Sequence, residues 1–221
     1  LDDKEMTLYN NVANILEKDV TLDIALILGE MLERKLNVNV IYTRTEDVFI
    51  PLWKRTKIAN EEEGKLFISI HANAAHPSIF GFETYLLNPN KSSEAIDVAN
   101  RENAVIELEK DTKNYTLYSD ENLILATMTQ NYYMQESEEL ATLIQKYMDE
   151  NLTSRNRGIK QAGFHVLVGA SMPNVLIEVG FLTNKNEAKQ LNNKQYKRKI
   201  AESIFNAIKE YKFNLEQQID S

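Results

Sequence analysis

The hydrophobic positions of this 221-residue chain follow two periodicities, and each predicts one kind of element. Three segments repeat apolar residues every three or four positions, which is typical of amphipathic helices with one buried face. They run from Asp19 to Met31, from Leu140 to Met148 and from Ile200 to Ile208. We expect a further helix from Pro51 towards Asn60, because proline favours the first turn of a helix.

Five short apolar runs predict strands: Val38–Tyr42, Leu66–Ile70, Phe82–Leu87, Phe164–Val168 and Val175–Val179. Polar segments between them, such as the basic stretch Arg155–Gly158, are expected to be turns. Because helices and strands alternate along the chain, the sequence predicts an α/β architecture with a mixed or mostly parallel sheet flanked by helices.

Residues 88–137 interrupt this alternation. A helix is expected from Ser92 to Leu108, followed by a loop rich in Asp, Asn and Tyr and a second helical piece near residues 123–128. About fifty residues between a strand and its next core helix is long for a compact α/β unit. We therefore predict a partly helical insertion within one domain that spans residues 1–221.

Composition and charge narrow the classes of partner. The net charge of −8 argues against nucleic acid or an anionic membrane as the main partner. No apolar stretch is long enough to span a bilayer, and the charged start Leu1–Glu5 is not a signal peptide. The chain has no cysteine, so any metal must be held by His, Asp and Glu side chains.

Three polar residues interrupt apolar contexts and are candidates for chemistry. His71 follows a buried strand that would fix its backbone beside a cleft, as a metal ligand requires, although a structural histidine would look the same. Glu178 lies inside an apolar strand, where a carboxylate costs several kcal/mol unless it is paired or faces a metal. Glu17 precedes the helix that Asp19 is expected to cap, and it could equally complement the helix dipole.

The other histidines and the common motifs are less informative. His76 is expected in an exposed loop, whereas His165 would be either a substrate contact or a solvated strand residue. The sequence contains no His-Glu-x-x-His pair, Gly-x-Ser-x-Gly elbow or phosphate-binding loop.

If His71, Glu17 and Glu178 converge, a zinc ion would lower the pKa of its water to about 7, and the free glutamate would act as general base. Such a site hydrolyses an amide without a covalent intermediate.

Six fragments occur in an order that carries a family resemblance. They are Glu17–Val20, Tyr42–Asp47, Ser69–Asn73, Gly81–Tyr85, Arg157–Lys160 and Met172–Phe181. Together they resemble the zinc-dependent N-acetylmuramoyl-L-alanine amidases, the type-3 amidases of bacterial cell-wall turnover. The resemblance implies a twisted mixed sheet flanked by helices.

The resemblance also implies roles for individual residues. Glu17 and His71 would be zinc ligands and Glu178 the catalytic base, with Asn73 and His165 as candidate substrate contacts. The reaction would cleave the amide between N-acetylmuramic acid and the L-alanine of the peptidoglycan stem peptide. Such a protein would act in the periplasm, or elsewhere in the cell envelope or outside the cell.

One family motif is absent. The family's Gly-His-Gly-Gly turn supplies a further zinc ligand, but Leu1–Leu16 contains neither histidine nor glycine. We expect that ligand in a segment outside this chain. The alternatives are a non-catalytic peptidoglycan-binding or regulatory protein of the same fold, and a zinc peptidase.

The insertion has a counterpart in some family members, in which a helix blocks the active site. Val98–Val105 resembles that helix, and Glu102 is the candidate to occupy the zinc until an activator protein removes it. The alternative for Glu102 is an acidic residue on a merely solvated helix.

Overall fold

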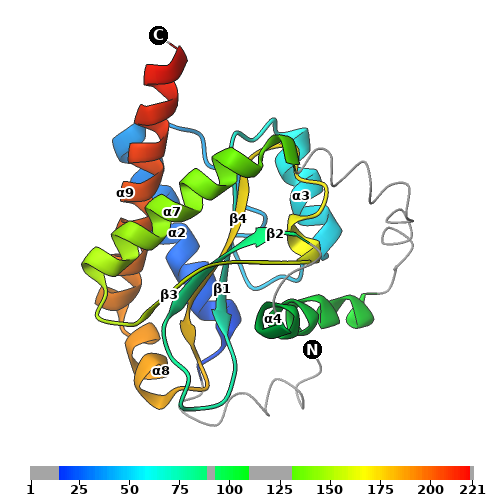
Figure 1. The fold of residues 1–221 in the computed structure, drawn as a ribbon, viewed down its shortest axis with the longest axis vertical. Helices are drawn as coiled ribbons and strands as arrows, with labels where there is room; N and C mark the ends of the chain where they lie inside the picture. Colours follow the sequence, from blue (N-terminus) through cyan, green and yellow to red (C-terminus); the bar gives the residue numbers. More distant parts are fainter. Residues whose placement is uncertain (1–14, 89–92, 110–130, 220–221) are drawn as a thin grey trace.

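A four-stranded sheet with the order β1-β4-β2-β3 organises the computed structural model, which describes residues 15–88, 93–109 and 131–219 (Figure 1). The strands are β1 Phe67–Asn73, β2 Phe82–Leu87, β3 Asn156–Ala162 and β4 Asn174–Phe181. The helices are α2 Glu17–Leu36, α3 Leu52–Glu61, α4 Ser93–Asn103, α7 Met134–Asn151, α8 Lys185–Leu191 and α9 Lys194–Ile219. Two 3₁₀ turns, η1 Ala104–Leu108 and η2 His165–Leu167, complete the described elements.

The sheet is mixed and mostly parallel, as the sequence predicts. β1 pairs with β4 and β2 pairs with β3 in parallel, whereas β2 and β4 are antiparallel. All eight residues of β4 are buried, because the strand lies between two neighbours and is covered on both faces. β3 lies at the edge of the sheet, and six of its seven residues are at least partly exposed.

Helices cover both faces of the sheet (Figure 1). On one face α2, α7 and α9 pack against Val175, Ile177 and Val179 of β4. On the other face α3, α4 and η2 pack against Leu176 and neighbouring strand residues. Side chains of a strand alternate between the faces. The even-numbered residues of β4 therefore face α4, and Glu178 is one of them.

The predicted amphipathic helices are confirmed. Ile200, Ile204 and Ile208 form the buried stripe of α9, and Leu140, Ile144 and Met148 that of α7. The helix expected after Pro51 is α3, with Pro51 as the residue that precedes it. α2 begins at Glu17 rather than after Asp19, and no side chain caps it, so the predicted Asp19 cap is wrong.

Two of the five predicted strands are wrong. Residues 38–42 belong to no strand among the described residues, and Asn39 and Ile41 are exposed. Residues 164–168 form the turn η2 instead, since Leu167 N–H donates to the Phe164 carbonyl and Val168 N–H to that of His165. The neighbouring strand β2 has already ended at Leu87, so it offers no partner there.

The basic stretch expected to be a turn contributes to β3, which starts at Asn156. Its polar sequence, Asn-Arg-Gly-Ile-Lys-Gln-Ala, lacks the apolar run of a buried strand because this strand lies at the sheet edge. Of the predicted insertion, α4, η1 and the first residues of α7 are described, whereas Ser92 and residues 123–128 lie outside the described residues. None of the described helices has the length and apolar character needed to cross a bilayer.

Candidate metal centre

Strand register places three ionisable residues side by side across the sheet. His71 of β1 lies opposite Glu178 of β4, and Glu178 lies opposite Glu83 of β2. All three are buried, with exposed fractions of 9 %, 0 % and 1 %. Phe67 of β1 packs on the face of the sheet that α4 covers. His71 lies four residues further along the strand, so strand alternation directs it to the same face. The row His71–Glu178–Glu83 therefore lies beneath α4.

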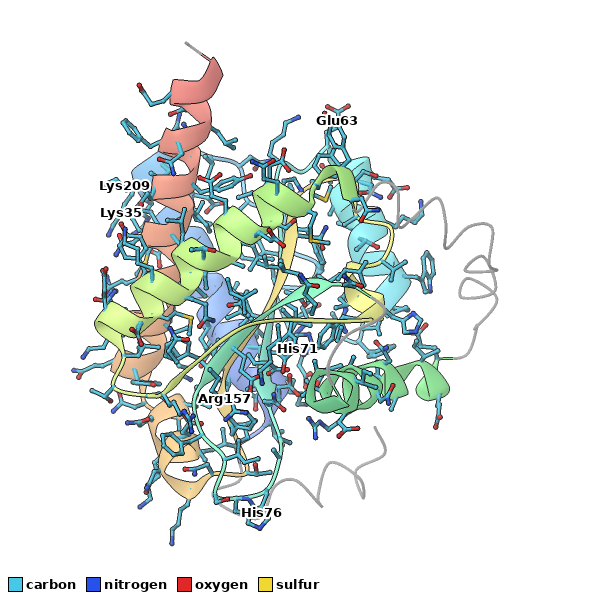
Figure 2. All side chains as sticks on the ribbon, viewed as in Figure 1. Lys35, Glu63, His71, His76, Arg157 and Lys209 are labelled. Carbon is cyan, nitrogen blue, oxygen red and sulfur yellow. The ribbon has the colours of Figure 1, made fainter. Side chains whose placement is uncertain are left out.

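β1 extends past the point where the sequence predicts its end. His71 lies inside the strand rather than after it, and the register shifts between His71 and Asn73. The His71 Nε2 atom lies 3.1 Å from the Ser69 Oγ, which fixes the ring from behind. If Nε2 carries the proton of that hydrogen bond, Nδ1 keeps its lone pair for a ligand. In Figure 2 His71 lies within the sheet close to α4, whereas His76 lies on the exposed loop after β1, as expected.

The N-terminus of α2 brings Glu17 to this histidine. The Glu17 Oε1 atom lies 3.1 Å from His71 Nδ1 and accepts a 3.2 Å hydrogen bond from the Ala72 N–H. The start of α2 is held by the polar loop that precedes α3: Arg44 donates to the Lys18 carbonyl at 2.6 Å. This contact explains why the fragments Glu17–Val20 and Tyr42–Asp47 occur together.

A second carboxylate reaches His71 from α4. The Glu102 Oε2 atom lies 2.8 Å from His71 Nδ1, so the residue predicted as a plug does contact the candidate ligand. Ligand atoms of Glu17, His71 and Glu102 all lie within 4.8 Å of one another. In a tetrahedral zinc site with bonds of about 2.0–2.2 Å, ligand atoms are roughly 3.4 Å apart. The three groups are close enough together to bind one ion.

The hydrogen bonding of His71 supports the same fit. Nδ1 is buried and makes no hydrogen bond of acceptable geometry among the described residues, although both carboxylates lie within ion-pairing distance. A buried polar atom without a hydrogen bond costs about 1–3 kcal/mol. One imidazole and two carboxylates are donors that suit zinc. These residues therefore fit a metal ion.

Without a metal, a proton would occupy this point. Burial opposes the charged imidazolium, but the carboxylates of Glu102 and Glu17 outweigh it and raise the pKa of His71 well above its usual value. Burial also opposes ionisation of Glu102, but the His71 cation outweighs it and lowers the pKa of Glu102. The metal-free group is therefore an imidazolium between two carboxylates, and a cation would replace its proton.

Glu178 is the least satisfied polar side chain of the group. Both carboxylate oxygens are buried and have no hydrogen-bond partner among the described residues. Burial, with the nearby Glu102 charge as the next cause, raises the pKa of Glu178 well above its usual value. A cation beside such a carboxyl would favour its charged form and lower its pKa again. It is placed to exchange a proton with a group that lies between the sheet and α4.

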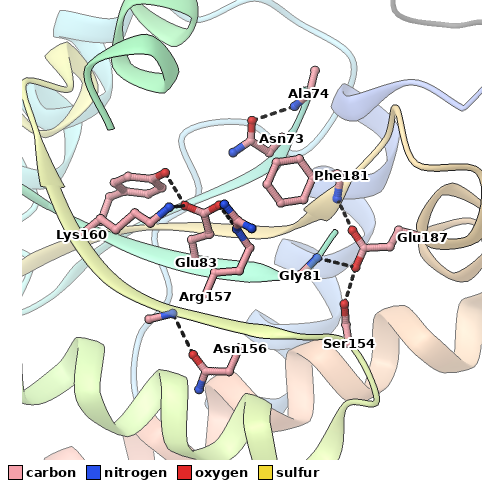
Figure 3. Close-up of polar contacts among 12 residues, drawn as sticks. Asn73, Ala74, Gly81, Glu83, Ser154, Asn156, Arg157, Lys160, Phe181 and Glu187 are labelled. Carbon is pink, nitrogen blue, oxygen red and sulfur yellow. Dashed lines mark hydrogen bonds and ion pairs between the residues drawn. The ribbon is translucent and has the colours of Figure 1, made fainter. Parts of the chain in front are cut away.

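Sequence reasoning missed the network around Glu83 (Figure 3). The Glu83 carboxylate contacts Arg157 Nε at 2.6 Å and Lys160 Nζ at 2.7 Å, and it accepts a hydrogen bond from the Tyr85 hydroxyl. Burial opposes ionisation, but Lys160, Tyr85 and Arg157 outweigh it and lower the pKa of Glu83. Part of the signal was present in the fragment Gly81–Tyr85, where Glu83 and Tyr85 alternate on one face of β2. Arg157 and Lys160 are three residues apart, and a register shift in the pairing of β2 with β3 brings both to Glu83.

A further carboxylate ties the strand ends together. Glu187 accepts hydrogen bonds from the Gly81 N–H at 3.0 Å and the Phe181 N–H at 2.8 Å, and from the Ser154 hydroxyl (Figure 3). Asn184 caps the helix α8 that carries Glu187. The start of β2 and the end of β4 are thereby held in register, which keeps Glu83 opposite Glu178.

The two candidate substrate contacts have different surroundings. Asn73 is fully buried: its Oδ1 accepts a 3.0 Å hydrogen bond from Arg101 Nη2, and its Nδ2 has no partner among the described residues. His165 lies on η2, half-buried, and its ring does not join the metal group. Burial lowers the pKa of His165. The prediction that it lies in a strand is wrong.

Comparison with known proteins decides the family. Residues 7–210 match the profile of the N-acetylmuramoyl-L-alanine amidase family, which is most of the chain. The chain belongs to this family. AmiA of Salmonella typhimurium, an N-acetylmuramoyl-L-alanine amidase, is 33% identical over 200 residues, which cover 88% of this chain and 68% of AmiA.

Other amidases extend this picture. AmiC of Escherichia coli O6:H1 is 31% identical over 201 residues, but the match covers only 47% of AmiC, so the chain spans about half the length of that relative. The crystal structure of an N-acetylmuramoyl-L-alanine amidase from Clostridium difficile 630 superposes with a TM-score of 0.67 at 28% sequence identity. That superposition covers 91% of this chain and 86% of the other, so the amidase fold extends over nearly the whole chain.

Proposed function

We propose that this chain hydrolyses the amide bond between N-acetylmuramic acid and L-alanine in peptidoglycan. One observation carries the proposal: ligand atoms of Glu17, His71 and Glu102 converge within 4.8 Å, directly beside the unpartnered carboxyl of Glu178. A metal-binding group next to a poised acid–base residue is what amide hydrolysis requires. Membership of the amidase family supports the same substrate.

In this proposal Glu17 and His71 hold zinc and Glu178 is the general base. Zinc, when bound, lowers the pKa of water to about 7 and polarises the scissile carbonyl. Glu178 takes a proton from the attacking water and later delivers it to the leaving nitrogen of L-alanine. Ser69 keeps the His71 ring in place. Arg157 and Lys160 hold Glu83 in its charged form, and that charge adds to the rise in the pKa of Glu178.

We further propose that the insertion 88–137, within a single domain, holds the site closed through Glu102. The carboxylate of Glu102 lies at the third corner of the metal group, where a substrate oxygen would otherwise bind. Ala95, Val98 and Ala99 bury the apolar face of α4 against the domain. An activator protein that binds only the open form would shift this equilibrium.

The reaction is tested with the zinc-loaded chain and purified peptidoglycan. Wild-type protein should release intact stem peptides from the glycan, and Glu178→Ala should release none while keeping its fold and its zinc. Glu150→Ala, an exposed residue on α7, is the matched control and should behave as wild type. Equal product from Glu178→Ala and wild type would exclude Glu178 as the base.

The same experiment separates the alternatives. A non-catalytic peptidoglycan-binding protein would bind the polymer without releasing products and would hold no stoichiometric zinc. A zinc peptidase would shorten the stem peptides but leave them attached to the glycan. Product analysis together with metal analysis therefore distinguishes all three functions.

The closed state is tested through α4. Glu102→Ala should raise basal activity, because it removes the carboxylate from the metal group while leaving the packed apolar face of α4 in place. Glu107→Ala, an exposed acid on the adjoining η1, is the control and should leave basal activity unchanged. Deletion of residues 93–109 should act as Glu102→Ala does. If neither change raises activity, the insertion does not inhibit the site.

The substrate implies where the protein works. Peptidoglycan lies outside the cytoplasmic membrane, so we propose a periplasmic, envelope-associated or secreted location.

A further inference from the structure

Asn103, the last residue of α4, makes a paired contact with the backbone that follows β3. Its Nδ2 donates to the Gly163 carbonyl at 2.8 Å, and its Oδ1 accepts from the His165 N–H at 2.8 Å. Because one partner can only accept and the other can only donate, the orientation of the side-chain amide is fixed by its surroundings. One carboxamide edge therefore satisfies two backbone groups on either side of Phe164.

This pairing is the pattern of a parallel β-ladder. In such a ladder the N–H of one residue donates to the carbonyl before its neighbour, and its own carbonyl accepts from the N–H after that neighbour. Phe164 lies between the two groups and is extended, with φ −73° and ψ 115°. It lies two residues past the end of β3, the edge strand. The last carbonyl of β3, that of Ala162, accepts from Asn88 on the β2 side and from the Phe164 N–H. The Asn103 amide thus takes the place of one residue of an added strand.

The contact is joined to the candidate metal centre through the backbone at the end of α4. Asn103 follows Glu102, whose carboxylate is 2.8 Å from His71 Nδ1, and consecutive Cα atoms are about 3.8 Å apart. An extended peptide advances by roughly 3.3 Å per residue. A peptide with one amide at the metal group would therefore place a neighbouring residue close to Gly163 and His165.

We propose that the Gly163 carbonyl and the His165 N–H form a peptide-binding subsite, which pairs with one extended residue of the stem peptide and which Asn103 occupies while α4 is closed. The inference rests on the proposed function for the identity of the peptide. Addition of a strand to an exposed sheet edge is a general mode of peptide recognition.

The same geometry disfavours the acetamido group of the sugar as the ligand. A secondary amide is planar and trans, so its N–H and C=O point in opposite directions. A single acetamido group can therefore make one of the two hydrogen bonds but not both. An extended peptide residue presents its own N–H and C=O on the same side and can make the pair.

The decisive variant is His165→Pro, which removes the N–H donor. His165 is the first residue of η2 and Phe164 is already extended, and both positions tolerate this proline. η2 is closed by Leu167 and Val168, which donate to the carbonyls of Phe164 and His165. His165→Ala removes the same ring but keeps the N–H. Both variants are made in the Asn103→Ala background, because the same N–H donates to Asn103 in the closed form. The ratio of kcat/KM between these two proteins therefore reports the loss of the donor to the substrate.

Three substrates identify what the donor binds: a muramoyl tripeptide, its N-deacetylated analogue, and an analogue with a methylene in place of the carbonyl of the second stem residue. With the first two, His165→Pro should be slower than His165→Ala by roughly threefold to tenfold, the effect of one net hydrogen bond. With the methylene analogue the ratio should approach one, because the acceptor of the His165 N–H is gone. A ratio of one on the parent tripeptide overturns the subsite. If the ratio falls to one only with the N-deacetylated substrate, the His165 N–H binds the acetyl group of the sugar, and the peptide proposal is overturned.

A binding measurement tests the subsite even if no substrate is cleaved or His165→Pro fails to fold. In Asn103→Ala protein, the His165 amide resonance should shift when an uncleaved stem tripeptide is added, and N-acetylglucosamine should shift it less. No shift with the tripeptide overturns the subsite. Absence of product from both wild type and Glu102→Ala protein, with this shift present, overturns the proposed amidase function instead.

Discussion

Replacing Glu83 by Gln should destabilise the protein, although Glu83 belongs to no predicted site. Its carboxylate is 1 % exposed and faces Arg157 and Lys160, whose side chains are 14 % and 16 % exposed. Removing one partner of a buried ion pair costs about 3–5 kcal/mol, because the remaining charge stays buried. Glutamine can still accept from Tyr85 and both cations retain some solvent, so we expect a loss of about 3 kcal/mol, equivalent to a fall in Tm of roughly 6–12 °C for a domain of this size.

Urea unfolding at pH 7, followed by circular dichroism, measures this loss. Glu216→Gln is the matched control, since its ion pair with Lys212 is exposed and should contribute less than about 0.5 kcal/mol. The pKa of Glu83 is lowered in the folded state, so its contribution is complete above the unfolded value of about 4.3 and is lost as pH falls through the folded pKa. A Glu83→Gln loss no larger than that of the control, or a loss independent of pH down to strong acid, would refute the reasoning.

Two further predictions concern the candidate metal centre. Glu178→Gln should abolish turnover yet stabilise the metal-free protein at pH 7 by about 1–3 kcal/mol. The reason is that the pKa of Glu178 is raised in the folded protein, so the carboxyl destabilises the fold at every pH above its unfolded pKa of about 4.3. A lower Tm for the variant in a melting experiment at pH 7 would contradict this. Zinc should raise the Tm of wild type, and at a hundredfold excess over its Kd it should add about 2.7 kcal/mol to the free energy of unfolding. His71→Ala protein should not show this increase. An equal effect of zinc on both proteins would mean that the metal binds elsewhere.

Most of the fold could be predicted from the sequence where burial is strong. The helices α7 and α9 and the strands β2 and β4 carry apolar patterns that only one arrangement satisfies. β3 was not predicted, since an edge strand buries little and its polar residues resemble a turn. Residues 164–168 misled for the opposite reason: they are largely buried, but no strand remains beside them to pair with.

The residues of the candidate site could be predicted from the sequence, but the contacts between their side chains could not. His71, Glu178 and Glu17 stand out because each places a polar group in an apolar or helix-initiating context. The contact of Glu102 with His71 depends on the packing of α4 across the sheet, so the family resemblance pointed to it but the residue pattern did not. Asn103 gave no signal at all, because its partners are backbone groups that carry no side-chain signature.

The order of the strands sets when the site can exist during synthesis. β4, the last strand along the chain, lies between β1 and β2, about a hundred residues earlier in the sequence. Until β4 has been synthesised, the chain therefore has neither Glu178 nor the strand that joins the two halves of the sheet. Such long-range pairing is slow to form. A chain that ends before β4 cannot assemble this sheet, so a hydrolase with this topology would gain its activity only once β4 has paired with both neighbours.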